Sequence, residues 1–421
     1  MTPTVGRPRP PATTLAELDD GRRLYGFADE DYGNVVDAFV ANFVEHHDVG
    51  AGCAVYVDGR PVVDLWGGIA ELRTRRPWQE HTPAVIFSVS KGILAICAYL
   101  LVQQGRLDLD APVALYWPTF ARCGKEAITV RQAMSHRAGL PCLDVDLTKE
   151  EVIAWDPVIR AIEDQRALFL PEAGHFYHAL TYGWLVGEVI HRVTGFLPGT
   201  YFRRAIGDPL ELHAWIGLPA SARRTVAWME APLPDEDSEA AREAARVLAT
   251  NRCVERSLSL GGAFAFPADG GVVTFNDPAI QTAEIPGANG IATPRSLARL
   301  YAACLTDLGA DRLLIDTSID DATQVRSTGP QLSGMPDDGT RWGTGFQLAS
   351  PPAQPMLGPG SFGHAGAGGQ LAFADPDYCV GFAYFSNQMG GYGDERARKL
   401  TLALRSALGA HASISSPQSA C

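Results

Sequence analysis

The stretch IFSVSKGILAICAYLLVQQG, residues 86–105, places a lysine at the beginning of a long apolar run. The apolar residues from Gly92 to Val102 predict a buried helix that is too short to span a membrane. Ser88 or Ser90 fits the N-cap of such a helix. Lys91 fits less well, because a capping box carries Glu or Gln three residues after the cap, and the helix dipole disfavours a cation there.

Lys91 has the properties of a proton acceptor at this position. Burial of the helix and the positive end of its dipole both disfavour the ammonium form, so we expect a lowered pKa for the amine. Ser88 lies three residues earlier on the same helical face, within reach of that amine. The small residues Gly92 and Ala95 leave room for a substrate beside this face. Because a serine and a lysine at this spacing are common by chance, a nucleophile at Ser88 needs support from other motifs.

A second segment, GHFYHALTYGWLVGEVIHRVTG (residues 174–195), carries a tyrosine just before another predicted helix. Two interpretations of Tyr177 are open. Its ring is a packed core residue, or its phenol joins Lys91 in proton transfer, as phenolate or as a hydrogen-bond relay.

A third segment, FGHAGAGGQLAFADPD (residues 362–377), is rich in glycine before a predicted strand. Glycine lets the backbone come close to another group. One amide from this segment and the amide of Ser88 are candidates for an oxyanion hole, which needs N–H groups near the developing charge. The alternative is a glycine-rich turn that leads into an edge strand.

Composition and charge narrow the class of protein. The chain has 421 residues, 46% of them hydrophobic, and a formal net charge of −13. An acidic surface argues against nucleic acid or an anionic membrane as a partner, and no apolar run reaches the roughly 20 residues of a membrane span. The first residues lack the apolar core of a secretory signal. Eight cysteines are scattered without a CxxC pair, which we interpret as buried, reduced thiols of a cytoplasmic protein.

Hydrophobic patterns predict a sheet domain assembled from both ends of the chain. Alternating apolar runs on either side of Asp58-Gly59 predict an antiparallel hairpin over residues 51–68. A second strand pair is predicted around Asp375-Pro376-Asp377, and helices over 32–47, 293–306 and 394–408. The predicted division is an N-terminal tail (1–22), a discontinuous α/β sheet domain (23–106 plus 287–412), a mostly helical domain with pocket-covering loops (107–286) and a C-terminal tail (413–421).

The order of these motifs resembles the serine β-lactamase and penicillin-binding-protein superfamily, and within it the class C β-lactamase-like esterases called family VIII carboxylesterases. The likeness extends from about Asp37 to Leu408. It is carried by Ser88-Val89-Ser90-Lys91, GRLDLDAPV (105–113), TVRQAMSHRAGLP (129–141), Tyr177-His178-Ala179 with LVGEVIHRVTG, and His364-Ala365-Gly366.

This resemblance implies an α+β fold, in which an α/β sandwich with an antiparallel sheet flanked by helices is joined to an all-α domain. It also implies roles for individual residues. Ser88 is the acylated nucleophile, Lys91 assists it, and Tyr177 acts as base. The backbone amides of Ser88 and Ala367 form the oxyanion hole.

Two positions depart from the class C β-lactamase pattern. Where the second motif of those enzymes ends in an Asn that binds the antibiotic's amide, this chain has Ala179. Where their third motif begins with a Lys that binds the antibiotic's carboxylate, this chain has His364, which is mostly neutral at pH 7 if its pKa is near 6.5. Loss of both contacts removes about 2–5 kcal/mol of recognition. We therefore expect weak or no β-lactamase activity.

The sequence thus predicts a serine carboxylesterase that works without a cofactor on a small-molecule ester or acyl substrate. His364, Gly366, Trp342 and His178 are its predicted substrate-binding residues. An acyltransferase or transesterase of natural-product metabolism is the first alternative, because the choice of acceptor depends on whether the pocket excludes water. A non-catalytic penicillin-recognising protein is the second. The oligomeric state is left open.

Other hydrolase and metal patterns do not match. The G-x-S-x-G elbow of α/β-hydrolases does not occur, since Gly360-Ser361-Phe362-Gly363 has its first glycine one place too close. Glu45-His46-His47-Asp48 and the pair His175 and His178 fit no known zinc spacing, so we expect no metal. His136 is predicted to hold a loop.

Overall fold

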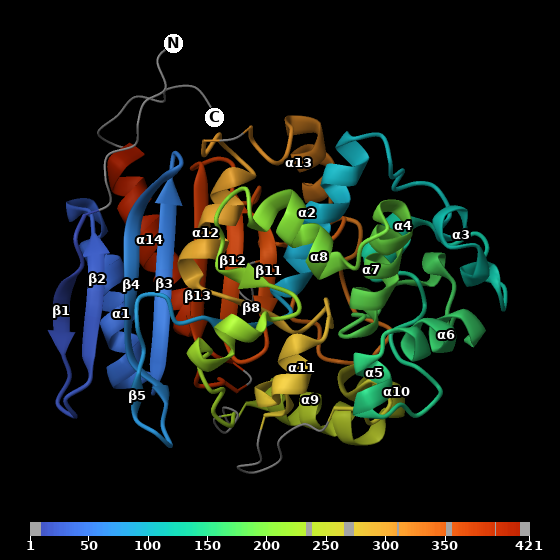
Figure 1. The fold of residues 1–421 in the computed structure, drawn as a ribbon, viewed down its shortest axis with the longest axis horizontal. Coiled ribbons are helices and arrows are strands. Elements are labelled where there is room, and N and C mark those ends of the chain that lie inside the picture. The colour runs from blue at the N-terminus through green and yellow to red at the C-terminus, as the bar shows by residue number, and fades with distance from the viewer. Residues whose placement is uncertain are drawn as a thin grey trace.

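A ten-stranded antiparallel sheet forms one side of the molecule, as Figure 1 shows for the computed structural model. The structure describes residues 10–232, 238–264, 273–309, 311–350, 356–391 and 393–412. The strand order is β1-β2-β4-β3-β13-β12-β11-β10-β9, and β5 pairs with β4. The strands are β1 (Thr13–Glu17), β2 (Arg23–Ala28), β3 (Gly50–Val57), β4 (Arg60–Glu71), β5 (Arg76–Pro77), β9 (Arg341–Trp342), β10 (Gln347–Leu348), β11 (Phe362–Gly366), β12 (Gln370–Asp375) and β13 (Val380–Ser386).

The predicted hairpin over residues 51–68 is confirmed as β3 and β4. Asp58 and Gly59 both have positive φ, 48° and 73°, which is the backbone of a tight hairpin turn. The centre of the sheet joins the two ends of the chain, because Val57 of β3 faces Val380 of β13 in the antiparallel register. The second predicted strand pair is confirmed as β12 and β13.

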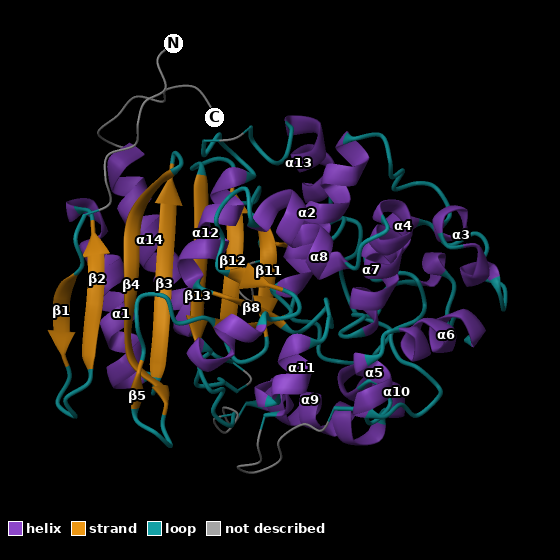
Figure 2. Ribbon diagram, in the orientation of Figure 1, coloured by secondary structure: helices purple, strands orange, loops and turns teal. Residues whose placement is uncertain are grey.

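Helices cover both faces of this sheet (Figure 2). On β13, Phe382 and Tyr384 belong to one apolar cluster, whereas Ala383 and Phe385 belong to the other. This alternation follows from the period of two along a strand. The first face packs against α1 (Gly33–Glu45) and α14 (Arg396–Ala412), and the second against α12 (Pro294–Ala303).

The other side of the molecule is mainly helical (Figure 2). A second, small sheet consists of β6 (Ala84–Phe87), β8 (Gly290–Ala292) and β7 (Ala214–Trp215). Helix α2 (Ser90–Gln103) is apolar around its whole circumference and packs against α7, α8 and β11. The remaining helices are α3 (Val113–Tyr116), α4 (Val130–Met134), α5 (Lys149–Ile153), α6 (Asp156–Asp164), α7 (Thr181–Thr194), α8 (Pro198–Phe202), α9 (Glu239–Thr250), α10 (Arg252–Ser259), α11 (Pro278–Thr282) and α13 (Asp316–Thr323). Within the described ranges, no helix has the length and apolar character needed to cross a membrane.

The expected extent of the N-terminal tail needs correction. Residues 13–17, expected in a tail, form the edge strand β1, because Thr13–Glu17 can hydrogen-bond to the exposed edge of β2. The expected C-terminal tail, 413–421, lies outside the described residues. The proposed division into a sheet domain and a helical domain stays a prediction.

The expectation of reduced, buried cysteines is wrong for part of the set. Cys142 and Cys253 form a disulfide across a sequence separation of 111 residues, and Cys379 is also disulfide-bonded. Cys53, Cys97 and Cys304 are free and buried, whereas Cys123 is free and exposed. A pairing between a loop and a helix so far apart in the chain leaves no spacing signal in the sequence. The cytoplasmic location loses the support that reduced thiols gave it, because disulfides are rare in cytosolic proteins.

Candidate active site

Ser88 lies between the end of β6 and the start of α2, and it does not cap the helix. The N-cap position is Val89, without a side-chain cap hydrogen bond. The neighbouring hydroxyl of Ser90 donates to the Phe87 carbonyl over 2.5 Å and accepts from the Gly290 amide over 2.9 Å. Phe87 itself has a positive φ of 45°, a strained conformation for an aromatic residue. The junction is thus fixed by its neighbours, and the Ser88 hydroxyl is left for other contacts.

The Ser88 hydroxyl contacts the two other residues of the predicted catalytic group. Its Oγ lies 3.0 Å from Lys91 Nζ and 2.8 Å from the Tyr177 hydroxyl. Lys91 comes from the first turn of α2, and Tyr177 from the loop before α7. Residues 89 positions apart in the sequence therefore meet at one oxygen atom.

Lys91 is completely buried, and burial lowers the pKa of its amine well below the usual value. Besides Ser88, its Nζ contacts the backbone carbonyls of Ala179, at 2.7 Å, and Gly287, at 2.8 Å. A neutral amine has two N–H groups and one lone pair. When its two hydrogens are donated to the two carbonyls, the lone pair faces Ser88 Oγ. The geometry suits an amine that removes the serine proton.

Tyr177 is held by its ring and by its backbone. The ring stacks on Trp342, with the centroids 5.0 Å apart and the planes at 17°, and the amide donates to Gln331 Oε1 over 2.9 Å. Burial raises the pKa of the phenol above its usual value. Both shifts favour the neutral forms, an amine and a phenol, so Tyr177 fits a proton relay better than a resting phenolate.

His178, predicted to bind substrate, contacts the backbone instead. Its Nδ1 donates to the Phe176 carbonyl over 2.6 Å, and its Nε2 accepts from the Leu140 amide over 3.0 Å. Burial lowers its pKa to about 4, so the ring is neutral near pH 7. With both nitrogens occupied, the ring has no polar atom for a substrate, which argues against the predicted contact. The loop role expected of His136 agrees with its Nδ1, which accepts from the His178 amide over 3.2 Å.

His364 lies in β11 with one ring nitrogen bonded and one unpaired. Its Nδ1 donates to the carbonyl of Ala365 over 2.5 Å, so this nitrogen carries the proton. Nε2 is then an acceptor, and among the described residues it has no hydrogen-bond partner. Burial, with a smaller effect of nearby Lys91, lowers the pKa of the ring to about 3. His364 therefore lines the cavity as a buried, neutral ring where an anionic substrate would need a cation.

The end of β11 packs directly against the strand before Ser88. A Cβ added to Gly366 would lie 2.4 Å from the Ile86 carbonyl oxygen, so only glycine fits this contact. This close approach brings the next residue, Ala367, to the cavity that Ser88 lines. The oxyanion role of the Ser88 and Ala367 amides stays a prediction.

A cavity of about 580 Å³ opens beside Ser88 and Tyr177. His364, Gly366, Trp342 and Ala179 are among the residues that line it, and the substrate-binding role of the first three stays a prediction. Most of its remaining wall is apolar, including Phe87, Leu180, Leu258, Phe264, Phe275 and Met389. Among the described lining residues there is no lysine or arginine, and Asp338 carries the single charge. The described residues also hold no cluster of three or more His, Cys, Asp or Glu side chains suited to a metal ion.

Comparison with known proteins identifies the family. The family model described as Beta-lactamase matches residues 36–406. The chain belongs to the beta-lactamase family. It is 34% identical over 383 residues to Esterase/beta-lactamase LipL of Mycobacterium tuberculosis (strain ATCC 25618 / H37Rv), covering 88% of this chain and 84% of that protein.

Solved structures of the beta-lactamase family have the same fold. A penicillin-binding protein homolog from Caulobacter crescentus superimposes with a TM-score of 0.80 at 33% identity, covering 91% of this chain and 99% of the other. A family VIII carboxylesterase does so with a TM-score of 0.78 at 32% identity, again covering 91% and 99%. The predicted α+β fold is thereby confirmed.

Sequence reasoning missed several groups in this beta-lactamase-family site. The carbonyls of Ala179 and Gly287, which accept from Lys91, are backbone atoms and have no residue signature. Gln331 holds the Tyr177 amide, and Gln347 accepts from the Ala365 amide over 2.9 Å and lines the cavity. Both glutamines lie in segments without periodic patterning, so nothing in the sequence pointed to them.

Proposed function

We propose that this member of the beta-lactamase family hydrolyses neutral carboxylic esters through an acyl-enzyme on Ser88. The observation that carries the proposal is the Ser88 Oγ atom between a buried Lys91 amine, at 3.0 Å, and the Tyr177 phenol, at 2.8 Å. A serine activated by an adjacent base is the general arrangement of nucleophilic catalysis. The names of the relatives, an esterase/beta-lactamase and a carboxylesterase, support the same class of reaction.

In the proposed reaction the proton of Ser88 passes first to Lys91 and then to Tyr177. Lys91 Nζ accepts it while Oγ bonds to the ester carbonyl carbon, and the new oxyanion is bound by the amides of Ser88 and Ala367. When the bond from carbon to the alcohol oxygen breaks, the Tyr177 phenol donates its proton to the departing alkoxide, and the proton held by Lys91 restores the phenol. Water then attacks the acyl carbon while Lys91 accepts a proton from it. When the bond from carbon to Ser88 Oγ breaks, Lys91 returns this proton to Oγ, which releases the acid and restores the free serine.

The cavity favours a neutral ester over a β-lactam antibiotic. Ala179 offers a methyl group where the class C pattern has an amide, and His364 offers a neutral ring where that pattern has a cation. The described lining supplies no positive charge that could bind a carboxylate. An ester with an apolar acyl or alcohol group matches the aromatic and aliphatic walls, because burial of apolar surface stabilises the complex by about 25 cal/mol per Å².

Labelling with a fluorophosphonate probe tests the nucleophile. We expect the wild type and the control variant Ser318→Ala, a buried serine of α13, to be labelled and to hydrolyse 4-nitrophenyl butyrate. Ser88→Ala is expected to lose both properties while it keeps its circular dichroism spectrum. Equal labelling of Ser88→Ala and wild type would contradict the proposal. Addition of an alcohol acceptor to the wild-type reaction separates hydrolysis, with acid as the product, from acyl transfer, with a new ester.

A further inference from the structure

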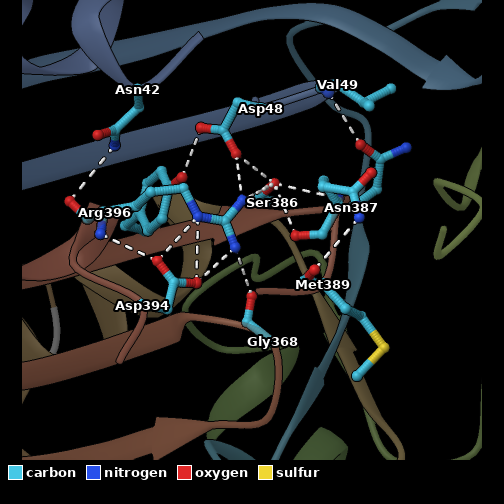
Figure 3. A network of polar contacts seen from close by, with 12 residues as sticks. Asn42, Asp48, Val49, Gly368, Ser386, Asn387, Met389, Asp394 and Arg396 are labelled. Atoms are coloured by element: carbon cyan, nitrogen blue, oxygen red, sulfur yellow. Dashed lines mark hydrogen bonds and ion pairs between the residues drawn. The ribbon is translucent and has the colours of Figure 1, made fainter. Parts of the chain in front are cut away.

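A buried ionic network lies beneath the turn that joins β11 to β12, as Figure 3 shows. At its centre is Arg396, which is 1% exposed. Its Nη1 contacts Asp48 Oδ1 at 2.5 Å, and its Nη2 contacts Asp394 Oδ2 at 2.5 Å. The same Nη2 donates to the carbonyl oxygen of Gly368 over 2.9 Å. One guanidinium thus links two carboxylates to the backbone of the turn.

The Asp48 carboxylate has three polar partners in this network. Its carboxylate accepts from the Tyr384 hydroxyl over 2.5 Å and from the Ser386 hydroxyl over 2.6 Å, besides the Arg396 contact. A buried ion pair of this kind adds little stability compared with apolar residues of similar volume. Stability alone therefore does not explain why two charges from opposite ends of the chain meet here. The contact between Arg396 and the Gly368 carbonyl indicates that the network also acts on the turn.

The turn itself has little means of fixing its own shape. It reads Gly366-Ala367-Gly368-Gly369, and both Gly368 and Gly369 adopt left-handed φ values, +78° and +94°. Three of the four residues lack a side chain, and glycine has the most backbone freedom to lose on folding. A Cβ on Gly369 would lie 2.2 Å from Asp394 Oδ2, so the carboxylate packs directly on the turn.

Ala367 is held from both sides by these contacts. On one side, Gly366 pairs with Gln370 at the end of β11 and packs against the Ile86 carbonyl. On the other side, the Gly368 carbonyl accepts from Arg396 and from the Gly390 amide, over 2.9 and 3.2 Å. The direction of the intervening Ala367 amide is set only when both sides are fixed. An oxyanion donor has to be in position before the reaction, since misplacement by about 1 Å costs on the order of 10²-fold in rate.

We propose that Arg396 and Asp394 are positioning residues that hold the Gly368 carbonyl and thereby aim the Ala367 amide at the oxyanion formed on Ser88. The inference rests on the proposed acyl-enzyme. It adds two residues outside the cavity that hold the oxyanion site in place. It predicts that disturbing the network weakens binding of the transition state more than binding of the substrate.

Asp394→Asn and Arg396→Lys test this role by steady-state kinetics. In Asp394→Asn the amide group cannot bind Arg396 with both oxygens, yet the Arg396–Asp48 ion pair remains, so the fold is kept. We expect kcat for 4-nitrophenyl butyrate to fall by about 10-fold or more, as a fraction of the 10²–10³-fold effect of losing one oxyanion donor. KM is expected to stay within about twofold. The inhibition constant of a boronic acid, whose oxygen occupies the oxyanion position, is expected to rise by the same factor as kcat/KM falls.

Arg295→Lys is the matched control. Arg295 forms another partly buried ion pair, with Asp64 at 2.6 Å between α12 and β4, away from the turn. We expect a lower melting temperature for this variant with unchanged kcat and boronate affinity.

Two outcomes would overturn the inference. One is folded Asp394→Asn with wild-type kcat and boronate affinity, whatever happens to Arg396→Lys. The other is an equal loss of kcat in Arg295→Lys, which would show a general effect of lower stability. Neither outcome touches the proposed function, which fails only if Ser88→Ala stays active and labelled.

Discussion

At the scale of single residues, the site depends on Lys91, whose Nζ contacts no carboxylate among the described residues. Lys91 contacts the Ser88 hydroxyl and two backbone carbonyls, and it is fully buried. Carbonyl dipoles orient the amine without the strong preference for the ammonium form that a carboxylate would impose. The amine of Lys91 therefore loses its proton more easily than that of an exposed lysine, at the expense of stability.

Because the folded protein disfavours the charged form of Lys91, the difference in stability between wild type and Lys91→Met depends on pH. The folded pKa of Lys91 lies below its unfolded value, so between these two values the unfolded chain binds a proton that the folded chain lacks. The free energy of unfolding of wild type, relative to Lys91→Met, is thus expected to rise with pH by up to about 1.4 kcal/mol per unit until roughly pH 10.5. Urea titrations between about pH 7 and 10 measure it. Parallel curves for the two proteins would show that Lys91 is charged in the folded state.

Tyr177→Phe separates the phenol from the ring. Phenylalanine keeps the stacking on Trp342, so we expect a melting temperature close to that of wild type. The hydroxyl that contacts Ser88 is lost, and kcat/KM for 4-nitrophenyl butyrate is expected to fall by about 10²–10⁴-fold, the usual contribution of general acid–base catalysis. Stopped assays at several ester concentrations measure the loss. Activity within a few-fold of wild type would assign Tyr177 to packing alone.

Some residues of the site could be predicted from the sequence and others could not, for physical reasons. Lys91 stood out because a cation at the N-terminal end of an apolar helix conflicts with both burial and the helix dipole. His178 was assigned to substrate binding because the sequence does not reveal the orientation of its ring. In the structure its two nitrogens bind backbone groups. Backbone acceptors such as the Gly287 carbonyl are invisible in any sequence of side chains.

At the scale of elements, α10 is fastened to the loop after α4 by two independent links. Arg256 reaches the carbonyls of Leu143 and Val145 and the carboxylate of Asp146, and the Cys142–Cys253 disulfide closes the same contact. Leu258 of this helix lines the cavity. The wall of the cavity therefore depends on a segment that is far away in sequence from the nucleophile.

Replacement of both cysteines, Cys142→Ser with Cys253→Ser, tests the covalent link. A disulfide that closes a loop of this size contributes up to about 5 kcal/mol, chiefly by restricting the unfolded chain. We expect the urea midpoint of the double variant to fall accordingly, and dithiothreitol to lower the wild-type midpoint by more than that of the variant, in which the Cys379 disulfide remains. A wild-type midpoint that does not respond to the reductant would contradict the pairing in solution.

Elements were predictable where a local signal defined them. The Asp58-Gly59 turn with its alternating flanks predicted β3 and β4, and the apolar run after Lys91 predicted α2. Strand β1 was missed because an edge strand is stabilised by its partner β2 and not by its own pattern. The 111-residue separation of the disulfide likewise exceeds any local signal.

At the scale of the whole molecule, the net charge of the chain and the charge of the cavity lining have the same sign. The chain carries a formal net charge of −13, and the described cavity lining includes Asp338 without a lysine or arginine. Both features repel an anion, at long range and within the cavity. The fold class was predictable from sequence because motif order along the chain reflects it, whereas the shape of the cavity arises from side chains of many segments.

A matched pair of substrates tests this selectivity. We expect 4-nitrophenyl methyl succinate to be hydrolysed with a kcat/KM at least about 10-fold higher than 4-nitrophenyl hydrogen succinate, a difference of about 1.4 kcal/mol. The two differ by one methyl group and one negative charge. The gap should narrow at high ionic strength to the extent that it comes from long-range repulsion. Equal values at low salt would show that the cavity accepts a carboxylate.

The pairing of β3 with β13 also matters while the protein is being synthesised. Val57 leaves the ribosome about 320 residues before its partner Val380, which at about 5–20 residues per second leaves a gap of roughly 15–65 s. During this time the hairpin of β3 and β4 exposes the strand edge that β13 later occupies, and an open apolar edge invites pairing with other chains. Slow translation or a truncated C-terminus would therefore favour aggregation of nascent chains, and a chaperone that binds extended apolar strands would protect them.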